Sequence, residues 1–193
     1  WWYGDTPLRR GYLKLCDWIS PADPADWKDN VSLANSNWTA ELLRRDYGVE
    51  AEVLYPPVSA GFAAIPYGER EKGFVCIGRI IPEKRIETIV AILEGVRRRG
   101  HDVHLHIVGS PDGNSPYVRR LRKDCLERNS DWVSFEGSID EGSKNKLIMN
   151  HCFGISGRKD EPFGIGVAEM VEAGCIVFVP DNGGQAEIVN HAE

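Results

Sequence analysis

The chain has 193 residues, of which 42% are hydrophobic and 27% charged, which suits a globular protein with one good core. Its 23 basic and 29 acidic side chains give a net charge of −6, the wrong sign for a general nucleic-acid-binding surface. No stretch approaches the ~18 uninterrupted apolar residues that a membrane-spanning helix needs.

Cysteine and histidine usage argues against disulfides and against zinc. The five cysteines are odd in number and show no Cys-Xaa-Xaa-Cys spacing, and Cys76, Cys152 and Cys175 lie in apolar runs where cysteine packs as a small hydrophobe. We therefore expect a reducing compartment and a cytoplasmic protein. His104 and His106 share one face of an expected strand without nearby cysteines, so a partly exposed strand face is favoured and no metal site is expected.

The first third of the chain is mixed in character. Residues 1–30 are rich in tryptophan and broken by prolines, which predicts either an ordered aromatic-rich surface segment or a fragment of another domain. We expect strands at 31–35 and 51–55 around a helix at 38–47 that Gly48 ends. Residues 56–72, rich in Pro, Gly and Ala without periodicity, are typical of an interdomain linker.

Strand and helix patterns alternate regularly after the linker. We expect strands at 74–77, 104–108, 132–135, 152–156 and 176–179, and helices at 83–99, 116–129, 141–150, 163–173 and from near 185. The strands are short, apolar and rich in Val, Ile and Phe, which is typical of strands buried on both faces. The pattern predicts an α/β fold: a Rossmann-like parallel sheet with helices on both faces.

In such a sheet, ligands bind beyond the carboxyl ends of the strands, so the residues that follow each strand are candidates. After the first of these strands, Gly78 permits close backbone approach, and Arg79 and Lys84 can clamp a diphosphate. On this local sequence alone, two solvated basic residues are the simpler interpretation. Gly109 follows the next strand, and Gly137 with Ile139 follows the third; these loops could hold a nucleotide, although ordinary turns use the same residues.

The most informative segment follows the fourth strand and contains two glutamates. We expect Pro162 in the first turn of a helix, which leaves the N–H groups of Phe163, Gly164 and Ile165 unpaired at a positive helix end suited to phosphate. Glu161 would lie just outside this helix, within reach of a sugar hydroxyl.

Glu169 falls further along the same helix, on a small or apolar face. A carboxylate there is costly unless it is paired or accepts strong hydrogen bonds, and ribose hydroxyls are suitable donors. The alternative is that Glu161 caps the helix and Glu169 lies on the surface.

Residues from about 31 to 190 resemble glycosyltransferase family 4, retaining enzymes with two facing Rossmann-like domains, known as the GT-B fold. The paired glutamates with seven residues between them are specific when they follow the other matches in order, and weak in isolation. The resemblance rests on residues 35–43, 55–58, 78–79 with Lys84, 107–109, 133–137, Ser156, 161–165 with Glu169, 183–184 and 187–189.

The resemblance implies roles for these residues. Arg79 and Lys84 would hold the donor diphosphate, Glu161 the transferred sugar and Glu169 the ribose. The amides of 163–165 would bind phosphate, and Gly109 and residues 137–139 would line the base. In this family the leaving phosphate is thought to help deprotonate the acceptor on the same face, which gives retention, and neither a metal nor another cofactor is required.

The resemblance also implies a truncated chain. Residues 1–57 would be a remnant of the N-terminal acceptor-side domain with the start of the linker, and residues 58–193 the nucleotide-sugar-binding Rossmann-like domain. Two departures leave every ligand group in place: Arg85 stands where the family often has glycine after the lysine, and residues 169–174 read Glu-Met-Val-Glu-Ala-Gly instead of Glu-Ala-Met-Ala-Xaa-Gly.

The expected function is transfer of a hexosyl group, with retention, from a nucleoside diphosphate sugar to a saccharide or lipid-linked acceptor. The alternative is a non-catalytic nucleotide-sugar-binding module. Another GT-B enzyme, such as an epimerase or phosphorylase, fits the glutamate spacing less well. The net charge gives no basic patch for a membrane surface, so peripheral membrane contact would belong to parts outside this chain.

Overall fold

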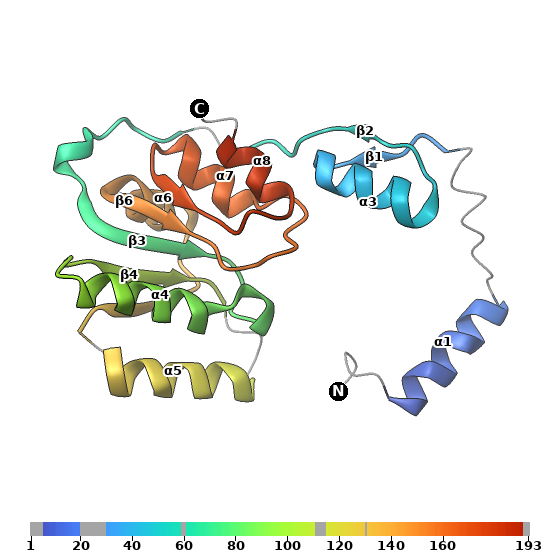
Figure 1. The fold of residues 1–193 in the computed structure, drawn as a ribbon, viewed down its shortest axis with the longest axis horizontal. Coiled ribbons are helices and arrows are strands. Elements are labelled where there is room, and N and C mark those ends of the chain that lie inside the picture. Colours follow the sequence, from blue (N-terminus) through green and yellow to red (C-terminus); the bar gives the residue numbers. More distant parts are fainter. Residues whose placement is uncertain (1–5, 20–29, 59–60, 111–114, 130, 191–193) are drawn as a thin grey trace.

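The structure is a computed structural model that describes residues 6–19, 30–58, 61–110, 115–129 and 131–190. Its main body is a five-stranded sheet in the order β5-β4-β3-β6-β7, and all neighbouring strands are parallel (Figure 1). The strands are β3 (Glu71–Ile77), β4 (His104–Val108), β5 (Val133–Gly137), β6 (His151–Ile155) and β7 (Ile176–Phe178). The chain winds outward from β3 in one direction and then returns to its other side, which confirms the Rossmann-like α/β prediction.

Helices cover both faces of this sheet and create two apolar layers. One layer joins β3 and β4 to α4 (Ile86–Arg98) and α5 (Pro116–Asn129) through buried residues that include Leu93 and Leu105. The other joins the opposite face to α6 (Glu141–Asn150) and α7 (Ile165–Glu172) through Ile148 and Met170. Strands between two apolar layers must be apolar on both sides, which is why they appear in the sequence as unbroken hydrophobic runs.

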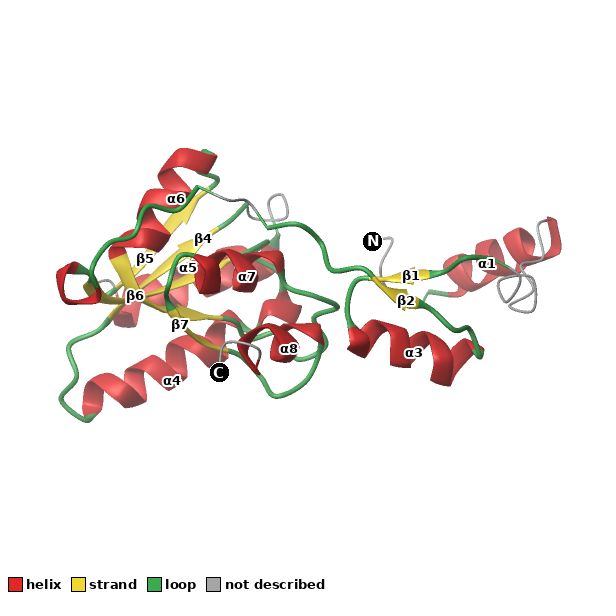
Figure 2. Cartoon of the chain, turned by 90° about the horizontal axis from the view of Figure 1, so that it is seen from above, coloured by secondary structure: helices red, strands yellow, loops and turns green. Residues whose placement is uncertain are grey.

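A smaller unit precedes the main sheet. The strands β1 (Leu33–Ala34) and β2 (Glu52–Val53) pair in parallel and flank α3 (Asn37–Tyr47), which Gly48 ends in the left-handed conformation at φ 62°. Figure 2 shows this unit beyond α8 (Gly184–Asn190), apart from the five-stranded sheet. Further towards the amino end, α1 (Pro7–Ile19) stands away from both units in Figure 1 and exposes large side chains such as Leu8 and Trp18.

Two helices begin later than predicted because the backbone is interrupted before each of them. Residues Pro82–Lys84 form a short 3₁₀ turn, and Arg85 adopts φ 51°, so α4 begins at Ile86 and not at residue 83. Gly164 adopts φ 99°, so α7 begins at Ile165 and the placement of Pro162 in its first turn is wrong. Arg85 thus occupies a conformation that glycine adopts without strain, at the position where the family often has glycine.

The five cysteines agree with the prediction of no disulfide framework. All are free thiols within the described residues, and all except Cys16 are buried. Burial raises the pKa of the Cys76 thiol to about 11, so it remains protonated and behaves as a packing residue. In the part of the chain that the structure describes, no helix combines the length and the hydropathy needed to cross a membrane.

Candidate functional site

Three neighbouring strands have a glycine at or directly after their carboxyl ends: Gly78 follows β3, Gly109 follows β4, and Gly137 ends β5. Gly78 donates its N–H to Val108 O at 2.9 Å, and Gly109 donates to Gly137 O, also at 2.9 Å. Gly109 has φ 154°, and a Cβ added there would lie 1.9 Å from Gly78 O, so only glycine fits without backbone movement. These glycines form a smooth backbone surface, and Ile139 beyond it packs against the apolar layer that contains α7.

The closest opposite charges at this edge belong to Lys84 and Glu161. Lys84 Nζ donates to Glu161 Oε2 at 2.6 Å, and the two side chains are only 18% and 13% exposed. Arg158 lies farther away, with Nη1 3.7 Å from the other carboxylate oxygen. The close approach depends on Gly157, since a Cβ there would lie 2.6 Å from Lys84 O. The fold therefore joins two residues that are 77 positions apart in a well-shielded ion pair.

A cavity of about 350 Å³ opens beside this pair. Its walls include Gly78, Lys84, Glu161 and residues 162–167, with Asn35 and Pro56 contributed by the smaller unit. At the start of α7, Val167 N and Ala168 N donate to Gly164 O, so Ile165 and Gly166 carry the amides of the first helical turn. Three amides, those of residues 163–165, were predicted at the amino end of this helix. Only the amide of Ile165 belongs to α7, whereas Phe163 and Gly164 precede the helix and line the cavity.

Glu169 is 5% exposed, which confirms that it interrupts a buried face, and it has a protein partner. Its Oε1 accepts from Lys144 Nζ of α6 at 2.7 Å, and Lys144 also lies 2.9 Å from Glu141 Oε1. Burial disfavours the lysine charge, but the two carboxylates outweigh it and raise the Lys144 pKa. Lys144 was not predicted from sequence, because nothing in the helix pattern of α6 singles out one lysine.

The structure divides the predicted residues into two groups. Gly78, Lys84, Glu161, Phe163, Gly164 and Ile165 line the cavity together. Arg79 is exposed outside it, and Gly109, Gly137, Ile139 and Glu169 are not among its lining residues. Most of the second group lies at or just after the carboxyl ends of β3, β4 and β5, whereas Glu169 is buried on α7.

Two further residues attach the smaller unit to the glutamate loop. Ser36 is fully buried, caps α3 by accepting from Thr39 N, and donates to Pro162 O at 2.6 Å. Glu187 of α8 accepts from the backbone N–H groups of Asn37 and Trp38 at 3.0 and 2.6 Å. The Ser36 cap has a recognisable sequence signal in a serine before a helix, whereas the Glu187 contact has none.

Burial tends to raise the pKa of Glu187, but the hydrogen bonds from Trp38 and Asn37 outweigh it and lower the pKa. The carboxylate therefore stays ionised at the positive end of α3 and fills the anion site of that helix from within the chain.

A larger cavity, of about 770 Å³, lies on the α4 face. Its walls include Phe74, Ile92, Leu93 and Phe178, and neither Lys84 nor Glu161 contributes to it. The smaller cavity contains the Lys84–Glu161 ion pair, and a pocket with such convergent charged groups is suited to bind a charged ligand. We therefore place the candidate functional site there.

The geometry agrees with the comparison to known families. The model of the family described as "Glycosyl transferases group 1" matches residues 62–193, more than half of the chain. The chain belongs to this family. The match covers the whole five-stranded sheet, the Lys84–Glu161 pair and Glu169.

Relatives named as mannosyltransferases support the assignment. The chain is 28% identical over 181 residues to a GDP-Man:Man(3)GlcNAc(2)-PP-Dol alpha-1,2-mannosyltransferase of Dictyostelium discoideum, which covers 83% of this chain and 36% of that protein. It is 32% identical over 137 residues to a GDP-mannose-dependent alpha-(1-6)-phosphatidylinositol monomannoside mannosyltransferase of Mycobacterium tuberculosis, with 64% and 33% covered. The chain thus spans about a third of the length of these relatives.

Solved structures show the same fold. WaaG, a glycosyltransferase involved in lipopolysaccharide biosynthesis, matches with a TM-score of 0.68 at 18% identity, over 97% of this chain and 53% of that one. Anabaena Alr3699/HepE in complex with UDP and glucose matches with a TM-score of 0.65 at 19% identity, over 81% and 46%. Both support the prediction of a GT-B type Rossmann-like domain.

Proposed function

We propose that this chain is the donor-binding part of a retaining glycosyltransferase that transfers a hexosyl group from a nucleoside diphosphate sugar to a saccharide or lipid-linked acceptor. The observation that carries the proposal is the shielded Lys84–Glu161 pair, which lies beside the first amides of α7 in one cavity at the carboxyl edge of the sheet. A cation and free helix amides suit a diphosphate, and a carboxylate beside them suits a sugar hydroxyl.

The donor lies across the sheet edge in this proposal. Lys84 and the amides of Ile165 and Gly166 hold the phosphates, and exposed Arg79 reaches them from the side. The base extends over Gly109 and the 137–139 loop, and the ribose reaches Glu169. Lys144 supplies the counter-charge that lets a carboxylate with 5% exposure remain there.

We further propose GDP-mannose as the donor, because both relatives described above use it by name. Their named acceptors, a dolichyl-diphosphate oligosaccharide and a phosphatidylinositol mannoside, favour a lipid-linked acceptor for this chain as well. The acceptor would be held by a facing domain, at the cytoplasmic surface of a membrane.

The proposed chemistry uses fixed charges and no metal. Negative charge develops on the leaving diphosphate as the glycosidic bond breaks, and Lys84 with the α7 amides stabilises it. The leaving phosphate accepts the acceptor proton on the face that it leaves, so the new bond forms on that face with retention. Glu161 orients the sugar throughout.

Calorimetric titration of the purified chain with GDP, UDP and ADP tests this proposal. We expect GDP to bind most tightly, and Glu169→Ala to weaken binding by roughly 10–100-fold, the equivalent of about one charge-assisted hydrogen bond. Glu172→Ala, an exposed position on the same helix, is the matched control and should bind like wild type.

Two outcomes contradict the proposal. If no nucleotide binds, the donor site is wrong. If Glu169→Ala binds GDP with unchanged affinity, the ribose role is wrong. Thermal unfolding of each variant separates lost binding from lost folding, because removal of Glu169 also removes one of the two carboxylate partners of Lys144.

A further inference from the structure

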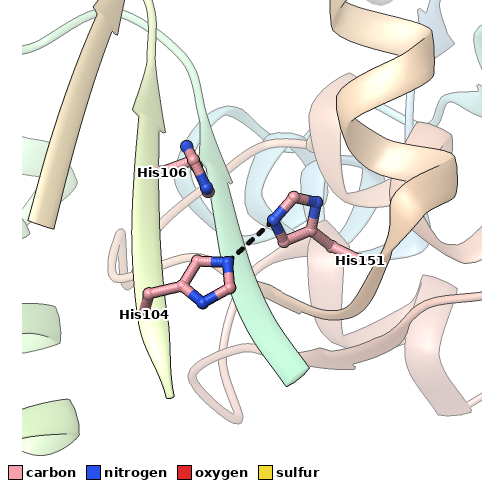
Figure 3. A group of neighbouring side chains, drawn as sticks. All are labelled: His104, His106 and His151. Atoms are coloured by element: carbon pink, nitrogen blue, oxygen red, sulfur yellow. Dashed lines mark hydrogen bonds between the residues drawn. The ribbon is translucent and has the colours of Figure 1, made fainter. Parts of the chain in front are cut away.

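Three imidazoles lie close together on β4 and β6: His104 and His151 are the first residues of these strands, and His106 is in the middle of β4 (Figure 3). One ring nitrogen from each lies within 4.8 Å of those from the other two, and His104 Nε2 is 3.0 Å from His151 Nε2. His151 is only 2% exposed, so this group is built into the protein and not scattered over its surface.

A glycine on β3 leaves the space in which the three histidine side chains come together. β3 runs between β4 and β6, and its Gly73 is in register with His104. A Cβ at Gly73 would lie 2.2 Å from His104 Nε2, so the imidazole occupies the space that a side chain of β3 would fill. Because β3 has a glycine at this point, histidine side chains from β4 and β6 can meet across it.

The outer nitrogens of two rings are already anchored. His151 Nδ1 lies 2.6 Å from Leu147 O, a carbonyl that can only accept, so Nδ1 carries the hydrogen and the Nε2 lone pair faces the cluster. His106 Nδ1 lies 2.7 Å from Glu136 Oε1, which fixes that ring in the same way. Histidines that bind metals usually donate their other nitrogen to a carbonyl or carboxylate in this manner.

Burial lowers the pKa of both His104 and His151, and it is the largest cause in each case. Neutral imidazole is the form that binds a metal. A carboxylate is also within reach, because Glu71 Oε2 at the start of β3 lies 3.5 Å from His104 Nε2 and 4.0 Å from His151 Nε2.

We propose that His104, His106 and His151, with Glu71 as a fourth ligand, bind Zn²⁺ in a structural site that is independent of the nucleotide. Three imidazoles and one carboxylate match its preferred donors and tetrahedral number. At a Zn–N distance of ~2.0–2.1 Å, tetrahedral ligand nitrogens lie ~3.3 Å apart. The 3.0 Å separation of His104 Nε2 and His151 Nε2 is close to this value, and a ring nitrogen of His106 lies within 4.8 Å of the ligand atoms of the other two histidines.

A metal there would fasten the starts of three adjacent strands, while the other edge of the sheet binds substrate. The site escapes sequence analysis because His151 lies 47 residues beyond His104, and only the parallel register brings the two together. The prediction of a partly exposed strand face considered His104 and His106 but not His151.

Zinc titration of chelator-treated protein tests the site. We expect one equivalent of Zn²⁺ to bind by calorimetry and to raise the unfolding temperature, and Co²⁺ to give the visible absorption of a tetrahedral complex. His104→Ala should abolish these effects, and His101→Ala, an exposed neighbour, should leave them unchanged. Glu136→Gln, which weakens the anchor of His106, should lower zinc affinity roughly 10–100-fold.

The proposal is overturned if wild type shows no saturable binding, or if His104→Ala binds zinc as wild type does. In either case the cluster is a hydrogen-bonded polar group in which His104 donates to His151. Circular dichroism of His104→Ala without metal confirms that the variant folds. GDP binding serves as a separate readout, since it depends on the opposite edge of the sheet.

Discussion

The Lys84–Glu161 pair can be tested by a double-mutant cycle with Lys84→Met, Glu161→Gln and the double variant. With side chains 18% and 13% exposed and a 2.6 Å contact, the pair is less shielded than a fully buried one. The loss of one partner from a fully buried pair costs ~3–5 kcal/mol. Arg158, 3.7 Å from the carboxylate, still neutralises Glu161 in part, so we expect about 2 kcal/mol for Lys84→Met.

For a chain of this size, each kcal/mol corresponds to a shift of ~2–4 °C, so Lys84→Met should unfold roughly 4–8 °C below wild type. The double variant should regain much of this loss, because no unpaired charge remains, with a coupling energy of about 1–3 kcal/mol. Nucleotide binding should behave differently. Both variants that lack Lys84 should lose GDP affinity at least ~10-fold, whether or not stability is recovered.

Thermal unfolding followed by circular dichroism measures the first quantity, and calorimetry with GDP measures the second. A coupling energy indistinguishable from zero would refute the ion pair. Recovery of GDP binding in the double variant would show that Lys84 acts only through the fold, and the assignment of the lysine to phosphate would then be wrong.

Two other predictions concern the backbone around the site. Gly109→Ala should lower the unfolding temperature, because the positive φ and the contact with Gly78 O cost ~1–3 kcal/mol of folding free energy. Gly68→Ala, with open space around that position, should have little effect. Equal shifts in unfolding temperature in the two variants would contradict the close packing at Gly109. Glu187 has a lowered pKa in the folded chain, so its contribution to stability is present above its ordinary value of 4.5 and is lost as the pH falls through the lower folded value. Trp38 fluorescence should report this acid transition, and Glu187→Gln should remove it; an unchanged transition in that variant would assign it to other groups.

The fold was predictable because its strands are buried on both faces and therefore appear as separate apolar runs. The helices at 116–129 and 141–150 and the strand at 104–108 were located with the correct bounds. The errors lie mostly where elements begin: α4 and α7 begin later than predicted, and β3 begins at Glu71, before the predicted start at residue 74 and inside the predicted linker. A proline normally indicates a first turn, but Pro162 is followed by Gly164 at φ 99°, and tertiary contacts decide that glycine's conformation.

The site was predictable in composition but not in pairing. Strand ends meet at one edge of a parallel sheet, which is why Gly78, Lys84 and Glu161 could be expected together. The prediction that Glu169 needs a partner was confirmed, yet the partner is Lys144, on a different helix. The Glu187 contact with α3 is likewise long-range, and local sequence carries no record of which distant groups become neighbours.

The Glu161 carboxylate that pairs with Lys84 would also affect the rate at which a ligand leaves the proposed site. In the proposed donor complex, an incoming diphosphate would meet a lysine that already has the Glu161 carboxylate at 2.6 Å. Glu161 is tethered to the same domain, so its local concentration is fixed however dilute the protein is, and every external anion must exchange with it. When the diphosphate leaves, Glu161 would form its ion pair with Lys84 again. If Lys84 holds the donor diphosphate as proposed, the chain carries its own competitor, which would weaken nucleotide affinity and hasten the release of a charged product.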